Sequence, residues 1–172
     1  ERILIVDDDS LSAALLQRHL EHAGYEVLIA SDGKTGLDMI LREKPDLALV
    51  DYHLPGVDGL HILEHARKEC PNTVFVIMTA YGSEDTAAQA LKLGADDYLI
   101  KPFRPWSVIA IVEENLEKGR QRRLTRSLIS ELDKSNRRLK QQHEELQLRN
   151  AALQEANARL EQLNRLREDF LS

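Results

Sequence analysis

The first two thirds of the chain alternate between short, wholly apolar runs and longer stretches in which apolar residues recur every three or four positions. Apolar runs of this kind predict strands buried on both faces, and the longer stretches predict amphipathic helices. Strands and helices in alternation predict a parallel sheet covered by helices, which is an α/β fold. We predict strands at residues 3–6, 26–30, 47–50, 74–78 and 98–100, and helices at about 11–23, 34–43, 58–69, 84–93 and 105–119.

A different pattern, with a period of seven residues, runs through the last third of the chain. Leucines occupy the d positions, and polar side chains fill most of the a positions. A buried asparagine at position a can bond its counterpart only in a parallel, in-register pair of helices. The pattern therefore predicts a parallel two-stranded coiled coil and a homodimer; the alternative is a single exposed helix with a leucine stripe. The d residues are Leu132, Leu139, Leu146, Leu153 and Leu160, and the a residues include Asn136, His143, Asn150 and Asn157.

Composition and charge divide the chain near residue 119. Residues 1–119 contain all eight glycines and all five prolines, with 11 Lys and Arg against 21 Asp and Glu. Residues 120–172 contain neither glycine nor proline, with 12 Lys and Arg against 8 Asp and Glu. We therefore predict a compact acidic domain over 1–119 and a helix over 120–172. This helix is expected to continue the one that begins at Pro105, a residue suited to a helix start.

Hydropathy and cysteine usage indicate the setting of the chain. No apolar run approaches the roughly 20 residues that a membrane-spanning helix needs. Cys70 is the only cysteine, so no disulfide can form within the chain, which fits a reducing, cytoplasmic location. The chain opens on Glu1 and leads directly into a predicted strand, so we expect it to be part of a longer protein.

Polar side chains follow four of the predicted strands at the point where each strand ends. The carboxyl ends of parallel strands meet at one edge of the sheet, where such folds place their sites. A single aspartate there is more often a turn former or a helix cap, as we expect for Asp9. Several strands delivering such residues together point instead to chemistry. The residues at this edge are Asp7, Asp8, Asp51, Thr79 and Lys101.

This set of side chains suits the transfer of a phosphoryl group. Clustered carboxylates repel one another unless a hard cation joins them, and Mg²⁺ (or Mn²⁺) prefers such oxygen ligands. An ammonium group and a hydroxyl can stabilise the oxygens of a phosphoryl group. The sequence therefore predicts phosphorylation of an aspartate at this edge of the sheet.

Four segments carry a resemblance to a known family: ILIVDDD, LVDYHLPGVDG, VIMTA and GADDYLIKPF. In order and spacing, residues 1–119 resemble a response-regulator receiver domain of two-component signalling. The resemblance implies a flavodoxin-like (βα)5 fold, a doubly wound parallel sheet of strand order 2-1-3-4-5. It also implies a histidine kinase or a phosphotransfer protein as the phosphodonor.

The resemblance assigns roles to individual residues. Asp51 would be the phosphoacceptor, and Asp7, Asp8 and Asp51 would hold Mg²⁺ together with the backbone carbonyl of His53. Lys101 would form an ion pair with the phosphoryl group, and the Lys101–Pro102 peptide would be cis. Thr79 and Tyr98 would be the switch residues that respond to phosphorylation.

Two further positions could tune the lifetime of the phosphoryl group. His53 lies two residues beyond Asp51, and Tyr81 lies two residues beyond Thr79. We hypothesise that the ring of Tyr81 hinders the attacking water. The alternative is that Tyr81 only packs on the following helix.

The last ten residues, LNRLREDFLS, resemble the segment that precedes the phosphoacceptor histidine of histidine kinases. The histidine box itself is absent from the chain. We therefore expect the chain to be the N-terminal part of a receiver-linked histidine kinase. The alternative is an ordinary helix end, with Leu163, Leu166 and Phe170 on one apolar face.

Other outputs are possible in principle and can be compared. A transcription factor is the main alternative, and a cyclic-dinucleotide enzyme is another. The basic run RQRRLTR at 120–126 lacks the context of a known DNA-binding motif, so we interpret it as a solvated junction and expect no nucleic-acid partner. An independent phosphatase of the haloacid dehalogenase type would need an aspartate where His53 stands. We expect the chain itself to catalyse only its own phosphorylation and dephosphorylation.

Overall fold

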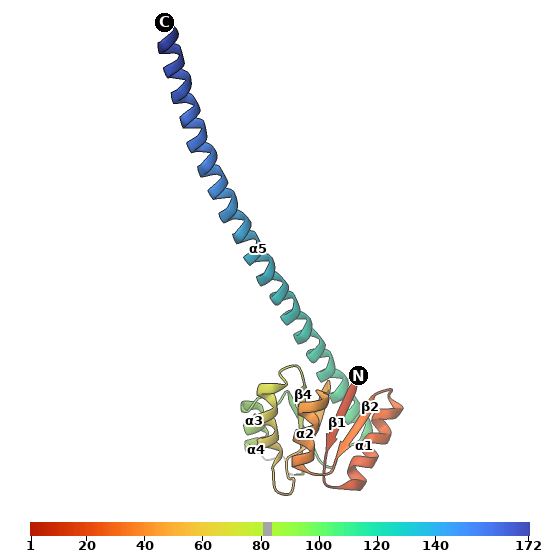
Figure 1. The fold of residues 1–172 in the computed structure, drawn as a ribbon. Helices are drawn as coiled ribbons and strands as arrows, with labels where there is room; N and C mark the ends of the chain where they lie inside the picture. Colours follow the sequence, from red (N-terminus) through yellow and green to blue (C-terminus); the bar gives the residue numbers. More distant parts are fainter. Residues whose placement is uncertain (81–83) are drawn as a thin grey trace. The chain divides into compact units, whose positions relative to one another are not determined.

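The fold was obtained as a computed structural model that describes residues 1–80 and 84–172. The chain forms two units, residues 1–124 and 125–172, which are considered separately. In the first unit, strands and helices alternate, as the sequence predicts (Figure 1). The elements are β1 (Arg2–Val6), α1 (Ser10–His22), β2 (Glu26–Ala30), α2 (Gly33–Glu43), β3 (Leu47–Asp51), α3 (Gly59–Glu69), β4 (Val74–Thr79), α4 (Glu84–Lys92), β5 (Asp97–Ile100) and α5 (Pro105–Leu171).

The five strands form one parallel sheet of order β2-β1-β3-β4-β5, which confirms the predicted topology. Four strands extend one residue beyond the predicted apolar runs: β1 and β5 at their amino ends, and β3 and β4 at their carboxyl ends. Asp51 pairs with Met78, and Thr79 pairs with Ile100, so both polar residues are the last members of their strands. They continue the backbone ladder because strand pairing depends on the main chain and not on side-chain polarity.

Two hydrophobic cores lie on the two faces of the sheet. One core packs α2, α3 and α4 against the sheet through residues such as Ile40, Leu63 and Ala90. The other packs α1 and α5 against it through residues such as Leu16 and Val112. The three central strands, β1, β3 and β4, are buried on both sides, which explains why they read as continuous apolar runs.

The loop aspartates divide into two groups with different tasks. Asp9 caps α1 by accepting hydrogen bonds from the backbone of the first helical turn, as expected. Asp32 and Asp58 cap α2 and α3 in the same way. These three carboxylates satisfy helix N–H groups that would otherwise lack partners. The aspartates considered below have no such task.

Helix α5 runs without interruption from Pro105 to Leu171, which confirms the expected long C-terminal helix. Gly119 lies within this helix, and a Cβ at this position would come 2.7 Å from Cγ2 of Val74. The glycine therefore allows α5 to approach the start of β4 closely. In the described parts of the chain, no helix is both long enough and apolar enough to cross a bilayer.

The second unit, residues 125–172, is helical throughout and carries the heptad leucines. The five d-position leucines are each 57–61% exposed. An apolar stripe of this regularity has nothing to bury it within the unit itself. Pairing of two such helices stays a prediction.

Candidate functional site

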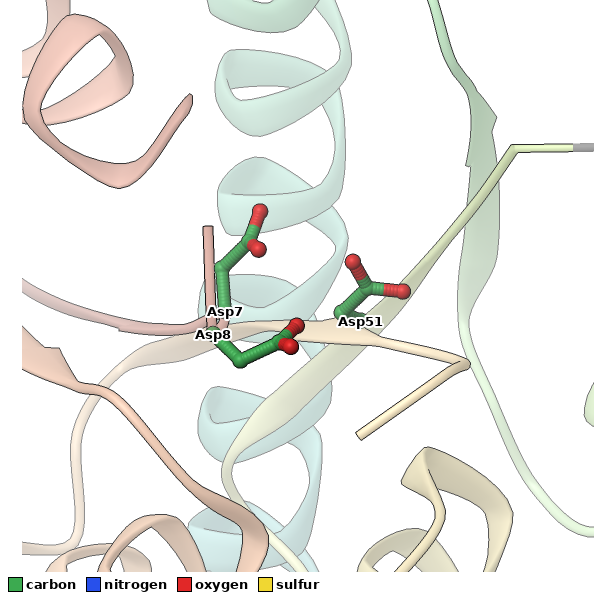
Figure 2. A group of neighbouring side chains, drawn as sticks. All are labelled: Asp7, Asp8 and Asp51. Atoms are coloured by element: carbon green, nitrogen blue, oxygen red, sulfur yellow. The ribbon is translucent and has the colours of Figure 1, made fainter. Parts of the chain in front are cut away.

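Three carboxylates converge at the carboxyl edge of the sheet, on two neighbouring strands. Asp7 and Asp8 directly follow β1, and Asp51 ends β3, which pairs with β1. One carboxylate oxygen from each lies within 4.8 Å of the others (Figure 2). Asp7 is 1% exposed and Asp51 is 7% exposed, whereas Asp8 is open to solvent. The cluster is therefore anchored in the protein and accessible from one side.

Lys101 joins two of these carboxylates. Its Nζ donates to Oδ2 of Asp7 at 2.8 Å and to Oδ2 of Asp51 at 2.5 Å. Burial lowers the pKa of Lys101, but hydrogen bonds and charge attraction from Asp51 and Asp7 outweigh burial and raise its pKa above the usual value. The ammonium group therefore stays charged at the place where a phosphoryl group bound to Asp51 would carry its own charge.

The backbone fixes the remaining carboxylate oxygens of the two buried aspartates. The N–H of His53 donates to Oδ1 of Asp51 at 3.0 Å. The N–H of Asp9 donates to Oδ1 of Asp7 at 2.9 Å. Each carboxylate is thus held in one orientation. The proposed use of the His53 carbonyl as a metal ligand stays a prediction, and the ring of His53 is exposed at the edge of the Tyr52 ring.

Thr79 and Tyr98 lie on the two strands beyond Asp51. Thr79 ends β4 and is buried, and its carbonyl accepts a hydrogen bond from the backbone N–H of Lys101 at 2.7 Å. Tyr98 lies in β5, opposite Ile77, and is half-buried. Their switching roles stay predictions. Tyr81 lies outside the described residues.

The loop after Lys101 has the geometry that the resemblance implies. The Lys101–Pro102 peptide is cis. On the other side of the site, a Cβ at Gly59 would lie 2.3 Å from the carbonyl oxygen of Asp51. Gly59 therefore lets the start of α3 lie close against the backbone of Asp51, a contact that sequence reasoning missed. The available signal in the sequence was the glycine that directly follows the Asp58 cap.

The donor set fits a hard divalent cation. Asp7, Asp8 and Asp51 offer carboxylate oxygens from one small region, the type of ligand that Mg²⁺ uses alongside water and phosphate. One ammonium group among three carboxylates leaves the site net negative. The exposed position of Asp8 gives a cation access from solvent.

The basic run at 120–126 is less solvated than expected. Arg120 is paired with Glu1, Arg122 with Asp96, and Arg123 with Asp46. Both Arg122 and Arg123 are half-buried. Three of the four arginines in this run thus form ion pairs within residues 1–124.

Fold and site together define a phosphate-accepting receiver, and comparison with known proteins places the chain in a family. Residues 3–113 match the response regulator receiver domain, and the chain belongs to this family. It is a receiver domain of two-component signalling with a long helix attached.

Relatives of known name or structure are similar over the receiver region. The alkaline phosphatase synthesis transcriptional regulatory protein PhoP of Bacillus subtilis is 40% identical over 119 residues, which are 69% of this chain and 50% of PhoP. The chain thus spans about half the length of that relative. A CheY-like receiver from Methanospirillum hungatei is 37% identical with a TM-score of 0.68, covering 71% of this chain and 98% of that one. NtrX from Brucella abortus, in complex with ADP, is 32% identical with a TM-score of 0.70, covering 74% and 29%.

Proposed function

We propose that Asp51 accepts a phosphoryl group from a phosphohistidine on a histidine kinase or a phosphotransfer protein, in a reaction that depends on Mg²⁺. The observation that carries this proposal is Lys101, whose ammonium group bridges Asp7 and Asp51 within a cluster of three carboxylates. Lys101 balances one of the three carboxylate charges, and a divalent cation bound beside it would balance the others and could also contact a phosphoryl group.

The transfer follows from the positions of these residues. An oxygen of Asp51 forms the new bond to phosphorus as the bond from phosphorus to the donor imidazole breaks, and the imidazole nitrogen keeps the electron pair. A bound Mg²⁺, held by Asp7, Asp8 and Asp51, would neutralise charge on the phosphoryl oxygens. Lys101 supplies a second positive charge, and the His53 N–H keeps the carboxylate oriented through Oδ1.

Phosphorylation is proposed to change the local structure through the contacts that Asp51 already makes. Its Oδ2 is bonded to Lys101 and its Oδ1 to His53, so a phosphorus atom on either oxygen removes charge from it and alters one of these two contacts. Thr79 is buried beside this edge on the adjacent strand, and its hydroxyl is proposed to bond the phosphoryl group. Tyr98, which lies on the next strand, is proposed to respond to the movement of Thr79.

Acetyl phosphate tests this part of the proposal directly. With Mg²⁺ present, the wild-type chain is expected to gain one phosphoryl group, measured by intact mass. Asp51→Asn and a wild-type sample in EDTA are expected to remain unmodified. Asp46→Asn is a matched control because Asp46 ends the loop before β3, at the opposite end of the strand from Asp51. Equal modification of Asp51→Asn and wild type would contradict the proposal.

We further propose that residues 125–172 form a parallel homodimeric coiled coil. In an antiparallel pair, Asn136, Asn150 and Asn157 would face leucines and lose their partners, whereas a parallel pair joins each to its counterpart. In the parallel pair, the g and e′ positions, such as Ser135–Lys140 and Arg149–Gln154, never oppose two charges, so they neither favour nor oppose this arrangement. The argument for the parallel orientation therefore rests on the asparagines. Sedimentation equilibrium is expected to give a dimer.

The dimeric coil is proposed to pass the receiver's state to a C-terminal output, a histidine kinase. The resemblance of residues 163–172 to the entry of a kinase dimerisation domain supports this output. Autophosphorylation of the full-length protein with labelled ATP tests it. A transcription factor is the second candidate, because PhoP is a transcriptional regulatory protein. Salt-dependent DNA binding by the full-length protein without ATP-dependent labelling would favour that second output.

A further inference from the structure

A set of ion pairs lies at the edge of the sheet opposite to the phosphoacceptor. Three carboxylates each stand immediately before a strand: Glu1 before β1, Asp46 before β3 and Asp96 before β5. Three arginines from α5 pair with them. We call this set of six residues, Glu1, Asp46, Asp96, Arg120, Arg122 and Arg123, the arginine clasp.

Asp96 is the firmest member of the arginine clasp. Arg122 Nη2 donates to its Oδ1 at 2.5 Å, and Arg67 Nη2 from α3 donates to its Oδ2 at 2.7 Å. The Phe75 N–H at the start of β4 also donates to Oδ2, at 2.8 Å. The Asp96 side chain is 11% exposed. Burial raises the pKa of Asp96, but these hydrogen bonds and the arginine charges outweigh burial and lower it.

The other two ion pairs bind the same turns of α5 to the residues that precede β1 and β3. Arg120 Nη1 donates to both oxygens of Glu1, at 2.7 and 2.8 Å. Arg123 Nη1 lies 3.5 Å from Oδ1 of Asp46. Gly119 lies against Val74 between these attachments and the buried Leu116. The helix is therefore fixed to strands on both sides of β4 until residue 123, and the fixation depends on charge and not on apolar packing alone.

Strand β5 connects this edge to the phosphoacceptor. It has only four residues, Asp97–Ile100. Lys101 at its carboxyl end is bonded to Asp51, and Asp96 at its amino end is bonded to Arg122. Asp97 adds a further contact by accepting a hydrogen bond from Asn115 of α5 at 2.8 Å. A displacement of Lys101 by a phosphoryl group thus acts on a short strand, and the other end of this strand is held to α5 by the ion pair between Asp96 and Arg122.

The polar groups around this grip are not all satisfied in the present arrangement. Within residues 1–80 and 84–172, Nε of Arg67 and Oδ1 of Asn115 are buried without a hydrogen-bond partner. Such atoms are rare in folded proteins and destabilise the arrangement that leaves them unpaired. Of the two, Asn115 lies at the contact between α5 and β5, so a second arrangement of α5 that gave its Oδ1 a donor would recover this loss.

We propose that the arginine clasp couples the receiver to the coil. It makes residues 116–123 of α5 move with the sheet, so that a change at Asp51 reaches the helix beyond residue 124 and is not lost by pivoting at the end of the receiver. The proposal rests on the proposed function, namely phosphorylation of Asp51 and transmission through α5. The three arginines are positioning residues and take no part in phosphoryl transfer.

Disulfide cross-linking in the coil measures this coupling. Asn136→Cys places a thiol at position a and Leu139→Cys at position d, and the ratio of the two cross-linking yields reports the rotation of the paired helices. Burial raises the pKa of the native Cys70 thiol, so the introduced cysteines react first. In the wild-type chain, beryllofluoride with Mg²⁺ is expected to change the ratio about fivefold, the lower end of usual allosteric couplings.

The arginine clasp is then opened without touching the site. Arg122→Gln with Arg123→Gln is expected to abolish the change in ratio, while acetyl phosphate still modifies Asp51 at the wild-type rate. Arg149→Gln is the matched control, because in the described parts of the chain Arg149 pairs with Glu145 of the same helix, and it should leave the change intact. Arg120→Glu and Glu1→Arg should each reduce the change. The two together should restore it in part, because Arg120 also pairs with Glu117 and Glu1 lies 4.0 Å from Arg123.

The outcomes separate this inference from the function on which it rests. A wild-type response that persists at full size in the Arg122→Gln, Arg123→Gln variant overturns the coupling role of the arginine clasp and leaves the proposed function standing. Absence of any response in the phosphorylated wild-type chain overturns transmission itself. Loss of the response with normal phosphorylation, and its rescue by the Glu1 and Arg120 exchange, establishes the coupling.

Discussion

The Nζ atom of Lys101 lies 2.5 Å from Oδ2 of Asp51, the carboxylate to which a phosphoryl group is proposed to attach. Under the proposed function, the lysine neutralises Asp51 before transfer, and its contact changes when Asp51 is modified. Lys101 would then have both a stabilising and a catalytic role, and the two contributions can be separated by experiment.

Lys101→Met is expected to slow phosphorylation of Asp51 by acetyl phosphate by about 10²-fold or more, as for the loss of one preorganised charge in other active sites. The substitution also leaves Asp7 and Asp51 without their shared cation, so stability should fall. Added Mg²⁺ should restore part of this stability but little of the rate. Chemical denaturation with Mg²⁺ or EDTA, together with phosphorylation kinetics, checks both expectations. A wild-type rate in Lys101→Met would contradict the catalytic role.

Asp96→Asn is expected to lower the free energy of unfolding by about 3–5 kcal/mol at neutral pH, because it leaves Arg67 and Arg122 without their shared carboxylate. The pKa of Asp96 is lowered in the folded state, so its contribution is complete above the unfolded value of about 3.9. It is lost as the pH falls through the folded value. The difference between wild type and variant should therefore shrink below pH of about 4. A difference independent of pH across this window would refute the assignment.

Gly119→Ala should destabilise the receiver by about 1–3 kcal/mol through overpacking, since the new Cβ would lie 2.7 Å from Cγ2 of Val74. Helix propensity alone predicts the opposite sign, a gain of about 1 kcal/mol. Thermal unfolding decides between them. A double-mutant cycle with Val74→Ala provides the control, because removing the Val74 methyl groups should relieve the overpacking.

Asn150→Leu is expected to stabilise the proposed dimer by about 1.5–3 kcal/mol, the value of burying a leucine. It should also weaken the preference for parallel, in-register pairing. Sedimentation equilibrium and thermal melts of residues 1–172 measure both effects. Leu148→Ala, on the outer side of the helix, serves as the control. If Asn150→Leu left the association constant unchanged, position 150 would not be in the interface.

The predictability of this fold and site differs among residues for physical reasons. Asp7, Asp8, Asp51 and Lys101 could be placed together from the sequence because each directly follows an apolar strand, and parallel strands end at one edge. The five strands were predictable from their apolar runs. The continuity of α5 was predictable because residues 120–172 contain neither glycine nor proline. The ends of β3 and β4 were less so, because Asp51 and Thr79 join the ladder through their backbones.

The contacts at the opposite edge of the sheet were not predictable. Arg122 and Asp96 are separated by 26 residues, and the sequence offers many acids that an arginine could contact. The close approach of α5 to β4 at Gly119 was equally hidden, because it depends on packing between residues far apart in the sequence. Local patterns specify elements, but the choice of ion-pair partner depends on how the elements are assembled. The roles of Thr79, Tyr98 and the His53 carbonyl stay predictions.

All six side chains of the arginine clasp belong to residues 1–124, and this makes the receiver a transferable unit. The ion pairs that hold α5 to the receiver do not depend on the sequence that follows residue 124. Each residue inserted after the junction turns an α-helix by about 100°, so grafts onto foreign outputs should work in spacings of whole heptads and fail between them. Gene fusion could have exchanged such outputs freely, provided that this angular phase was kept.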